Sequence, residues 1–185
     1  SGGRAGWNLV TSTHRAEAES FGTQPHMAKS ERYRRAREFA HVTRGLWNSF
    51  DDDAFPRDKE SGVFLDQDKL HILEHEGEHF QVRGPLNVPP SPQGEPVMVQ
   101  AGSSEDGREL AAETAEVVFG IHQTLEGAQG FYADVKARMA AYGRHPGALK
   151  IMPGLMVYVG QDKEAAAEKF EMMQDLIDDR TGIEF

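Results

Sequence analysis

The residues best suited to bind an anion follow the apolar run Val97–Val99. That run is typical of a short buried strand. Gly102, Ser103 and Ser104 come next, ahead of helical spacing over residues 108–115. The first N–H groups of a helix lack intrahelical partners, and the helix dipole favours negative charge there. Gly102 would let the backbone approach a phosphate, and the two hydroxyls would add hydrogen bonds. The sequence therefore predicts a phosphate cradle.

The same turn also fits a purely structural role. Ser103 is followed three residues later by Asp106, a pattern close to a capping box. Ser103 would then cap its helix and bind nothing. The residue types alone favour these two interpretations equally.

Three histidines at four-residue steps, His71, His75 and His79, suggest a metal site. Such spacing aligns ligands only on a helix. Gly77 and the alternating residues on either side of it favour a β-hairpin formed by 69–74 and 79–83. The pattern therefore favours strands over a metal site.

Other polar residues have ordinary explanations beside functional ones. His14 and His122 follow expected strands and are candidates for proton handling, although a role as plain loop histidines is favoured. The run Asp51–Asp53 is typical of a solvated turn. The basic run Arg32–Arg37 lies on an expected helix with flanking acids, which favours a solvated helix face or a local anion contact.

Composition limits the classes of function. The chain has 185 residues, 38% hydrophobic and 27% charged, as in ordinary globular domains. Its net charge of -10 argues against a nucleic-acid partner, which needs clustered Lys and Arg. Without cysteine there is no disulfide, thiolate metal site or Cys nucleophile, which fits a cytoplasmic protein. No apolar run approaches the roughly 20 residues of a membrane span, and no signal peptide is expected.

Strands and helices alternate along most of the chain. Helical apolar spacing predicts a helix from Ser30, as its N-cap, to Phe50, and a polar loop over 13–29 precedes it. The other expected elements are strands at 4–12, 97–99, 116–121 and 149–159, and helices at 108–115, from Thr124 to Tyr142, and from Asp162. Residues 51–95 lack a helical period and form an insertion that contains the hairpin.

Four βα units predict a parallel sheet with right-handed connections. Two architectures fit: an open doubly wound sheet, or part of a TIM (β/α)8 barrel. The abrupt first strand favours the barrel, so we expect one partial barrel domain over 1–185, with an insertion at about 51–95. In both architectures the strand ends at 8–12, 100–104, 120–123 and 153–156 would share one rim, where ligands bind.

Several stretches in order resemble the flavin-dependent monooxygenases related to nitrilotriacetate monooxygenase component A, a branch of the bacterial luciferase-like superfamily. The stretches are Gly3 to Ser12, Glu31-Arg32-Tyr33 with Glu38-Phe39 and Gly45-Leu46-Trp47, His79-Phe80 with Val82 to Asn87, Pro92-Gln93-Gly94, and Gln100 to Ser104. The resemblance covers nearly the whole chain. It implies a TIM barrel that binds reduced FMN and inserts one oxygen atom of O2 into a small organic substrate, with FMNH2 supplied by a separate NAD(P)H-dependent flavin reductase.

The resemblance also implies roles for individual residues. Asn8, Val10 and Thr11 would lie along the flavin ring, with Ser12 at its edge. Tyr33 and the turn of Gly102, Ser103 and Ser104 would hold the FMN phosphate. Members of the group often carry His four residues before the matching Tyr, where this chain has Lys29, which could contact the phosphate instead.

The family barrel has three further βα units before the strand at 4–12 and a last part after residue 185. An incomplete barrel exposes two strand edges and apolar interior, which predicts a homo-oligomer. Two alternatives remain open: a non-catalytic truncated half-barrel that self-associates, and a sugar-phosphate- or nucleotide-binding α/β domain.

Overall fold

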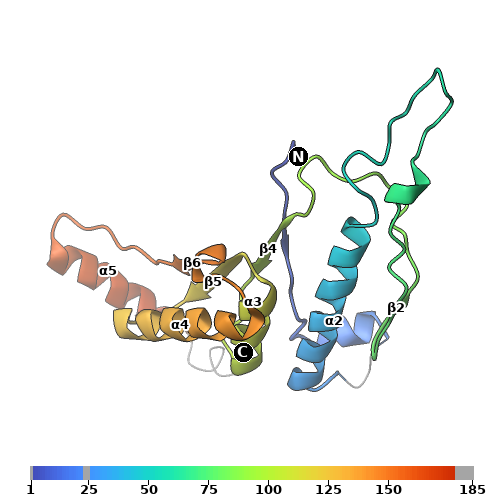
Figure 1. Cartoon of the computed structure of the whole chain (residues 1–185). Helices are drawn as coiled ribbons and strands as arrows, with labels where there is room; N and C mark the ends of the chain where they lie inside the picture. Colours follow the sequence, from blue (N-terminus) through green and yellow to red (C-terminus); the bar gives the residue numbers. More distant parts are fainter. Residues whose placement is uncertain (1, 23–25, 178–185) are drawn as a thin grey trace. The chain divides into compact units, whose positions relative to one another are not determined.

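The computed structural model of the chain describes residues 2–22 and 26–177 (Figure 1). The chain divides into two compact units, 1–153 and 154–185. Within the described ranges, no helix combines the length and the apolarity that a membrane crossing requires.

A four-stranded sheet organises the first unit. Its strands run in the order β1 (Gly6–Asn8), β4 (Val97–Gln100), β5 (Val117–Ile121) and β6 (Lys150–Gly154). β4 is parallel to both β1 and β5, as the βα pattern predicts. Asn8 pairs with Val99, and the amide of Leu9 extends this pairing by donating to the Val99 carbonyl at 2.9 Å. The ends of β1 and β4 therefore lie side by side.

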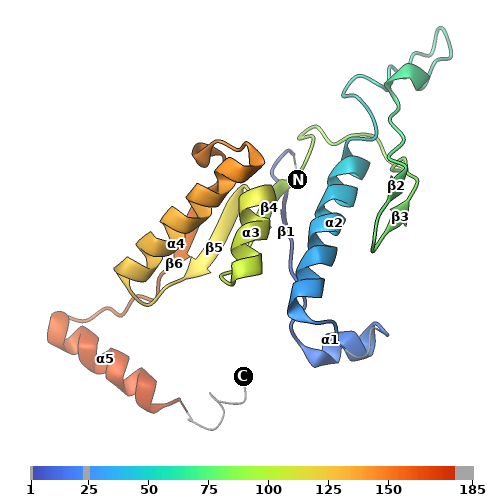
Figure 2. The same ribbon diagram turned by 60° about the horizontal axis from the view of Figure 1, so that its bottom comes forward.

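Three helices cover one face of this sheet (Figure 2). They are α2 (Lys29–Trp47), α3 (Glu105–Thr114) and α4 (Leu125–Arg138), the last extended by a 3-10 turn (Met139–Tyr142). One core cluster joins α2 and α3 to β1 and β4: Leu9, Ala36, Ala40, Met98 and Leu110, with Trp7, Tyr33 and Trp47 against it. The other joins α3 and α4 to β5 and β6: Ala111, Ala112, Ala115, Val118, Phe131, Val135, Met139 and Leu149, with Tyr142 and Ile151 against it.

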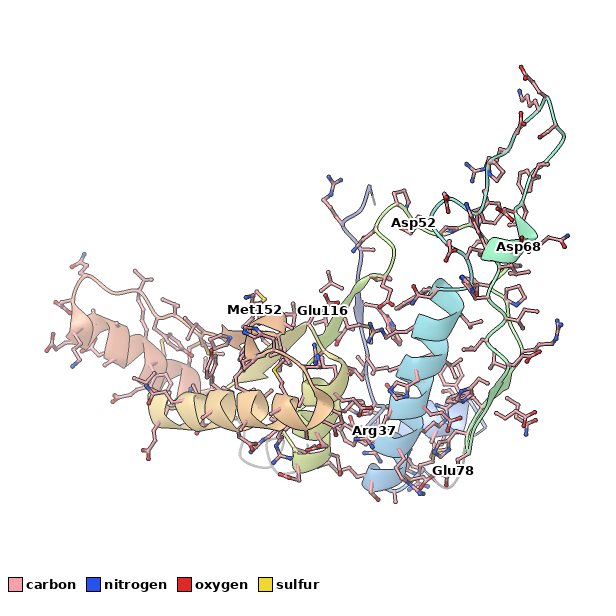
Figure 3. The ribbon with its side chains drawn as sticks, viewed as in Figure 1. Arg37, Asp52, Asp68, Glu78, Glu116 and Met152 are labelled. Atoms are coloured by element: carbon pink, nitrogen blue, oxygen red, sulfur yellow. The ribbon has the colours of Figure 1, made fainter. Side chains whose placement is uncertain are left out.

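The opposite face of the sheet is open. Side chains alternate along a strand, so residues next to the buried Met98 and Val118 point away from the helices. Phe119 on β5 is 44% exposed and Met152 on β6, labelled in Figure 3, is 57% exposed. Asn8 belongs to this face because it pairs with Val99.

The insertion forms a hairpin that is anchored to α2. Its strands, β2 (His75–Glu76) and β3 (Gln81–Val82), are antiparallel, as the alternation predicts, and a 3-10 turn (Gln67–Lys69) precedes them. The first strand, expected at 69–74, lies just after that range instead. The carboxylate of Glu38 accepts from the backbone N–H groups of His79 (2.9 Å) and Phe80 (2.8 Å), and lies 2.9 Å from His75 Nε2. The long insertion is thus tied to the helix that also contributes to the core.

The second unit contains α5 (Lys163–Asp175). As predicted, Asp162 precedes the helix, and its carboxylate caps it by accepting from the Ala165 N–H at 2.9 Å. Tyr158 packs edge-on against Phe170 of the helix, with ring centroids 5.4 Å apart.

Several expected boundaries are wrong. The strand expected at 149–159 ends at Gly154, because Pro153 and Gly154 interrupt it, and a 3-10 turn (Pro146–Ala148) precedes it. The residue before α2 is Ala28, which supplies no side-chain cap, so Ser30 lies inside the helix. The described part of the expected loop at 13–29 contains a short helix, α1 (Arg15–Ser20).

Candidate functional site

One serine in the turn between β4 and α3 caps the helix that follows. Ser104, rather than Ser103, is the N-cap: its hydroxyl accepts from the Gly107 N–H at 3.3 Å. Ser103 is exposed, and its carbonyl accepts from Arg108 Nε at 2.9 Å. The cap predicted at Ser103 is therefore wrong by one residue.

The hydroxyl of Tyr33 on α2 faces this turn. The Ser104 hydroxyl donates to the Tyr33 hydroxyl oxygen at 3.4 Å. A Cβ atom added to Gly102 would lie 2.9 Å from the Gly107 Cα and 3.3 Å from the Tyr33 hydroxyl. The turn therefore crosses the first turn of α3 so closely that both positions need glycine. The structure thus brings together Tyr33, Gly102 and Ser104, as predicted for the phosphate cradle.

Two acidic residues of α3 near the cradle, Glu105 and Glu109, are paired with a cation. Arg138 contacts Glu105 and Glu109 at 2.7 Å and Asp134 at 2.9 Å. A hydrogen bond from Tyr142, and to a smaller extent one from Arg138, holds the pKa of Glu109 below its usual value. Arg108 is bound to Asp134 at 2.9 Å. An anion at the cradle would therefore be held by N–H groups and hydroxyls.

A cavity of about 170 Å³ connects the cradle to the end of β1. Its walls include Val10, Thr11, Tyr33 and Gly102. Four of the predicted cofactor residues, from three separate elements, therefore line one space.

A larger cavity of about 420 Å³ lies between the end of β1, α1 and α2. Val10, Thr11 and Ser12 contribute to its wall. Three further wall residues carry buried polar atoms without a hydrogen-bond partner among residues 2–22 and 26–177: Glu17 Oε2, His26 Nε2 and Arg32 Nε. The sequence did not predict that these three residues would share one cavity wall. Only the fold brings them together.

Four predicted cofactor residues line neither cavity: Asn8, Lys29, Ser103 and Ser104. Asn8 is on the open face of the sheet, and the exposed Lys29 begins α2, one turn before Tyr33. The candidates for proton handling are also apart. His14 is exposed before α1, whereas the ring of His122 packs 4.8 Å from that of Phe131.

The basic run, the three spaced histidines and the acidic turn singled out in the sequence make contacts with residues of opposite charge. Arg37, labelled in Figure 3, bonds Glu113 at 2.5 Å and so links α2 to α3. The three equally spaced histidines contact different acids: His71 with Asp51, His75 with Glu38, and His79 with Glu31 and Glu78. In the expected turn at 51–53, Asp53 pairs with Lys69 at 2.6 Å.

A family model, a curated relative and two solved structures resemble this chain over nearly its whole length. Residues 1–182 match the luciferase-like monooxygenase family. The chain is 53% identical over 175 residues to nitrilotriacetate monooxygenase component A of Aminobacter aminovorans, covering 95% of this chain and 39% of the relative. It therefore spans about 40% of the length of that protein.

Two solved structures have the same fold over nearly the whole chain. A crystal structure of long-chain alkane monooxygenase matches with a TM-score of 0.85 and 39% identity, covering 94% of this chain and 40% of that one. A riboflavin lyase crystallised with modified FMN and riboflavin matches with a TM-score of 0.83 and 33% identity, covering 92% and 38%.

Proposed function

Because the chain belongs to the luciferase-like monooxygenase family, we propose that it binds reduced FMN between the end of β1 and the turn that precedes α3. The enzyme would insert one oxygen atom of O2 into a small organic substrate. Reduced flavin would come from a separate NAD(P)H-dependent reductase, a role consistent with the "component A" of the relative's name.

One observation carries this proposal. The hydroxyls of Tyr33 and Ser104 meet at 3.4 Å, beside a glycine turn and the N-terminus of α3. Unpaired helical N–H groups and hydroxyl donors suit a phosphate. Ser103 would add its exposed hydroxyl, and Lys29, one turn before Tyr33 on α2, would add a positive charge.

The two cavities suit the rest of the cofactor and its substrate. Val10 and Thr11 line both, so a flavin ring held against them would border the larger cavity. Asn8 and Ser12 would flank that position. When bound, reduced FMN supplies the reaction with O2. The protein's part is to orient the substrate and keep water out.

Glu17, His26 and Arg32 would bind the organic substrate. Their side chains line the larger cavity, and each carries a buried polar atom without a hydrogen-bond partner among the described residues. A buried polar atom without a partner is costly. A substrate with polar groups would satisfy them.

The test is an anaerobic titration of the chain with FMN, dithionite-reduced FMN and riboflavin, by calorimetry. In Ser104→Ala, loss of a hydroxyl from the phosphate site should weaken FMN binding by about 1–3 kcal/mol. Thr124→Ala is the matched control, because Thr124 caps α4 in the same way, accepting from the Gly127 N–H at 3.1 Å. Both variants should lose about 1 kcal/mol of stability, but only the first should lose affinity.

Riboflavin separates phosphate recognition from ring binding. It should bind the wild-type chain more weakly than FMN and should be insensitive to Ser104→Ala. Equal affinity for riboflavin and FMN would contradict the phosphate cradle. Tighter binding of a sugar phosphate or an adenine nucleotide than of either flavin would support the alternative α/β-domain function.

A further inference from the structure

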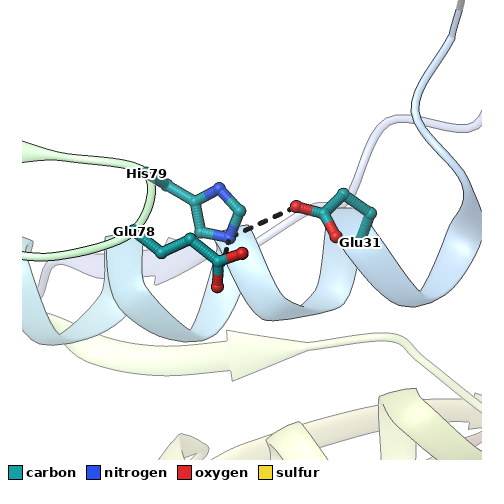
Figure 4. Close-up of side chains that lie close together, drawn as sticks. All are labelled: Glu31, Glu78 and His79. Atoms are coloured by element: carbon teal, nitrogen blue, oxygen red, sulfur yellow. Dashed lines mark ion pairs between the residues drawn. The ribbon is translucent and has the colours of Figure 1, made fainter.

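We propose that Glu31, Glu78 and His79 form a binding site for one zinc-type divalent cation, independent of the proposed flavin site. One donor atom from each residue lies within 4.8 Å of the other two. Glu31 is in the first turn of α2, whereas Glu78 and His79 lie in the turn of the hairpin (Figure 4). Glu31 and Tyr33 are about 200° apart around the helix, so this site and the cradle use different sides of α2.

The imidazole side chain of His79 is largely buried. Its side chain is only 10% exposed. Its Nε2 atom has no hydrogen-bond partner among the described residues, although it points between the two carboxylates (Figure 4). Buried polar atoms in proteins are almost always paired, so this nitrogen calls for an explanation.

The distances suit a shared ion better than hydrogen bonds. Nε2 lies 3.6 Å from Glu31 Oε1 and 3.8 Å from Glu78 Oε2, beyond the usual hydrogen-bond range. In a tetrahedral zinc site, bonds of about 2.1 Å separate nitrogen and oxygen ligands by about 3.4 Å. Small side-chain adjustments would therefore bring all three atoms onto one ion and leave a fourth position for water.

The backbone holds the histidine in place. Glu38 binds the N–H groups of His79 and Phe80, which fixes the hairpin turn against α2. Glu31 lies on the same helix as Glu38. The contact that Glu38 makes with the hairpin turn therefore holds His79 and its neighbour Glu78 near Glu31. Supporting interactions of this kind orient metal ligands.

The local charge also suits a cation. Two carboxylates face the histidine. Arg34 contacts both of them: Glu31 through Oε2, the oxygen that does not face His79, and Glu78 through Oε1 at 3.4 Å and Oε2 at 3.5 Å. One positive charge against two carboxylates leaves one net negative charge at the site. An imidazole nitrogen among the ligands favours zinc over magnesium or calcium, which prefer oxygen ligands.

The test is calorimetric titration of the EDTA-treated and desalted chain with zinc chloride. We expect one saturable site, with affinity at least tenfold weaker in Glu31→Gln and in Glu78→Gln. Glu78 is 60% exposed, so its variant should fold normally. His71→Gln is the matched control, because His71 is an exposed hairpin-side histidine paired with Asp51, and it should bind zinc like the wild type.

A second measurement follows the ligand itself. Zinc should shift the imidazole resonances of His79, identified by their loss in His79→Gln, while magnesium at the same concentration should leave them unchanged. Absence of one-site zinc binding would overturn the proposal. So would binding that Glu31→Gln and Glu78→Gln leave intact, because the ion would then lie elsewhere.

Discussion

Glu109 on α3 illustrates how a single carboxylate joins neighbouring elements. The Tyr142 hydroxyl donates to its Oε1 at 2.5 Å, and Arg138 donates to its Oε2 at 2.7 Å. These bonds lower the pKa of Glu109, and burial together with the bond to Glu109 raises the pKa of Tyr142 to about 12. The network ties α3 to the end of α4.

This network predicts acid sensitivity. The pKa of Glu109 is lower in the folded chain than its unfolded value of 4.5. Its ionised form therefore stabilises the folded chain at pH values above 4.5, and this stabilisation is lost as the pH falls through the folded-state pKa. Urea unfolding should therefore show a smaller difference between pH 7 and pH 3 in Glu109→Gln than in the wild type. The variant should reduce this pH-dependent change in unfolding free energy by less than about 1 kcal/mol, because Glu109 is partly exposed. An unchanged difference would assign the acid sensitivity to other carboxylates.

Residue types predicted part of the site. A strand, a Gly-Ser-Ser turn and a helix predicted the cradle, and the resemblance added Tyr33. The grouping of Glu17, His26 and Arg32 could not be predicted, because α1 has no strong periodic signal and their contacts are set by the fold. The cap was misplaced at Ser103, because the serine three residues before Asp106 fits the capping pattern, whereas α3 begins at Glu105 and is capped by Ser104.

At the scale of elements, the close crossing of Gly102 and Gly107 decides where α3 sits. A Cβ atom on Gly107 would lie 2.9 Å from the Gly102 Cα, 3.0 Å from the Gly102 carbonyl carbon and 3.1 Å from the Tyr33 hydroxyl. These neighbours are mostly backbone, so relief requires α3 to move away from the turn and from α2.

Two helical glycines therefore should respond oppositely to alanine. Gly107→Ala should destabilise the chain by about 1–3 kcal/mol, because crowding outweighs the gain in helix propensity. Gly130→Ala on α4, where nothing lies within 4 Å of the added Cβ, should stabilise by about 0.5–1 kcal/mol. Thermal unfolding of both variants is the measurement. Stabilisation by Gly107→Ala would contradict the close crossing.

Periodic elements were predictable, and irregular ones were not. The apolar stripe of α2 and the caps of α4 and α5 have strong local signals, and the structure confirms these helices. The strand expected at 149–159 was too long, because apolar residues continue beyond Pro153 and Gly154 although the pairing stops. Apolar character alone does not define where a strand ends.

At the scale of the molecule, the open face of the sheet exposes apolar side chains of the first unit. Its helix-covered face contains both core clusters, whereas Phe119 and Met152 are exposed on the other. The predicted partial barrel is confirmed by solved structures of which the chain covers about 40%. In a barrel, this face of the strands points inward.

The open face predicts self-association of the 185-residue chain. Sedimentation velocity should show an average mass that rises with protein concentration, because burying apolar surface drives association. Phe119→Lys should reduce this association. Val63→Lys is the matched control, because Val63 is also 44% exposed but lies in the insertion. A monomer at all concentrations, or equal effects of the two variants, would contradict this role for the face.

The long connection between β1 and β4 has a kinetic consequence. The stretch β4–α3–β5–α4–β6 forms its contacts between neighbouring segments, whereas β1 must find β4 across the whole of α2 and the insertion. Local contacts form quickly and distant ones slowly. We therefore expect residues 97–154 to acquire structure first and β1 to dock late. Tyr33 lies on α2, before the insertion, and Ser104 lies in the part that forms early. Competence to bind a phosphate therefore requires contacts across the insertion and should appear late in folding.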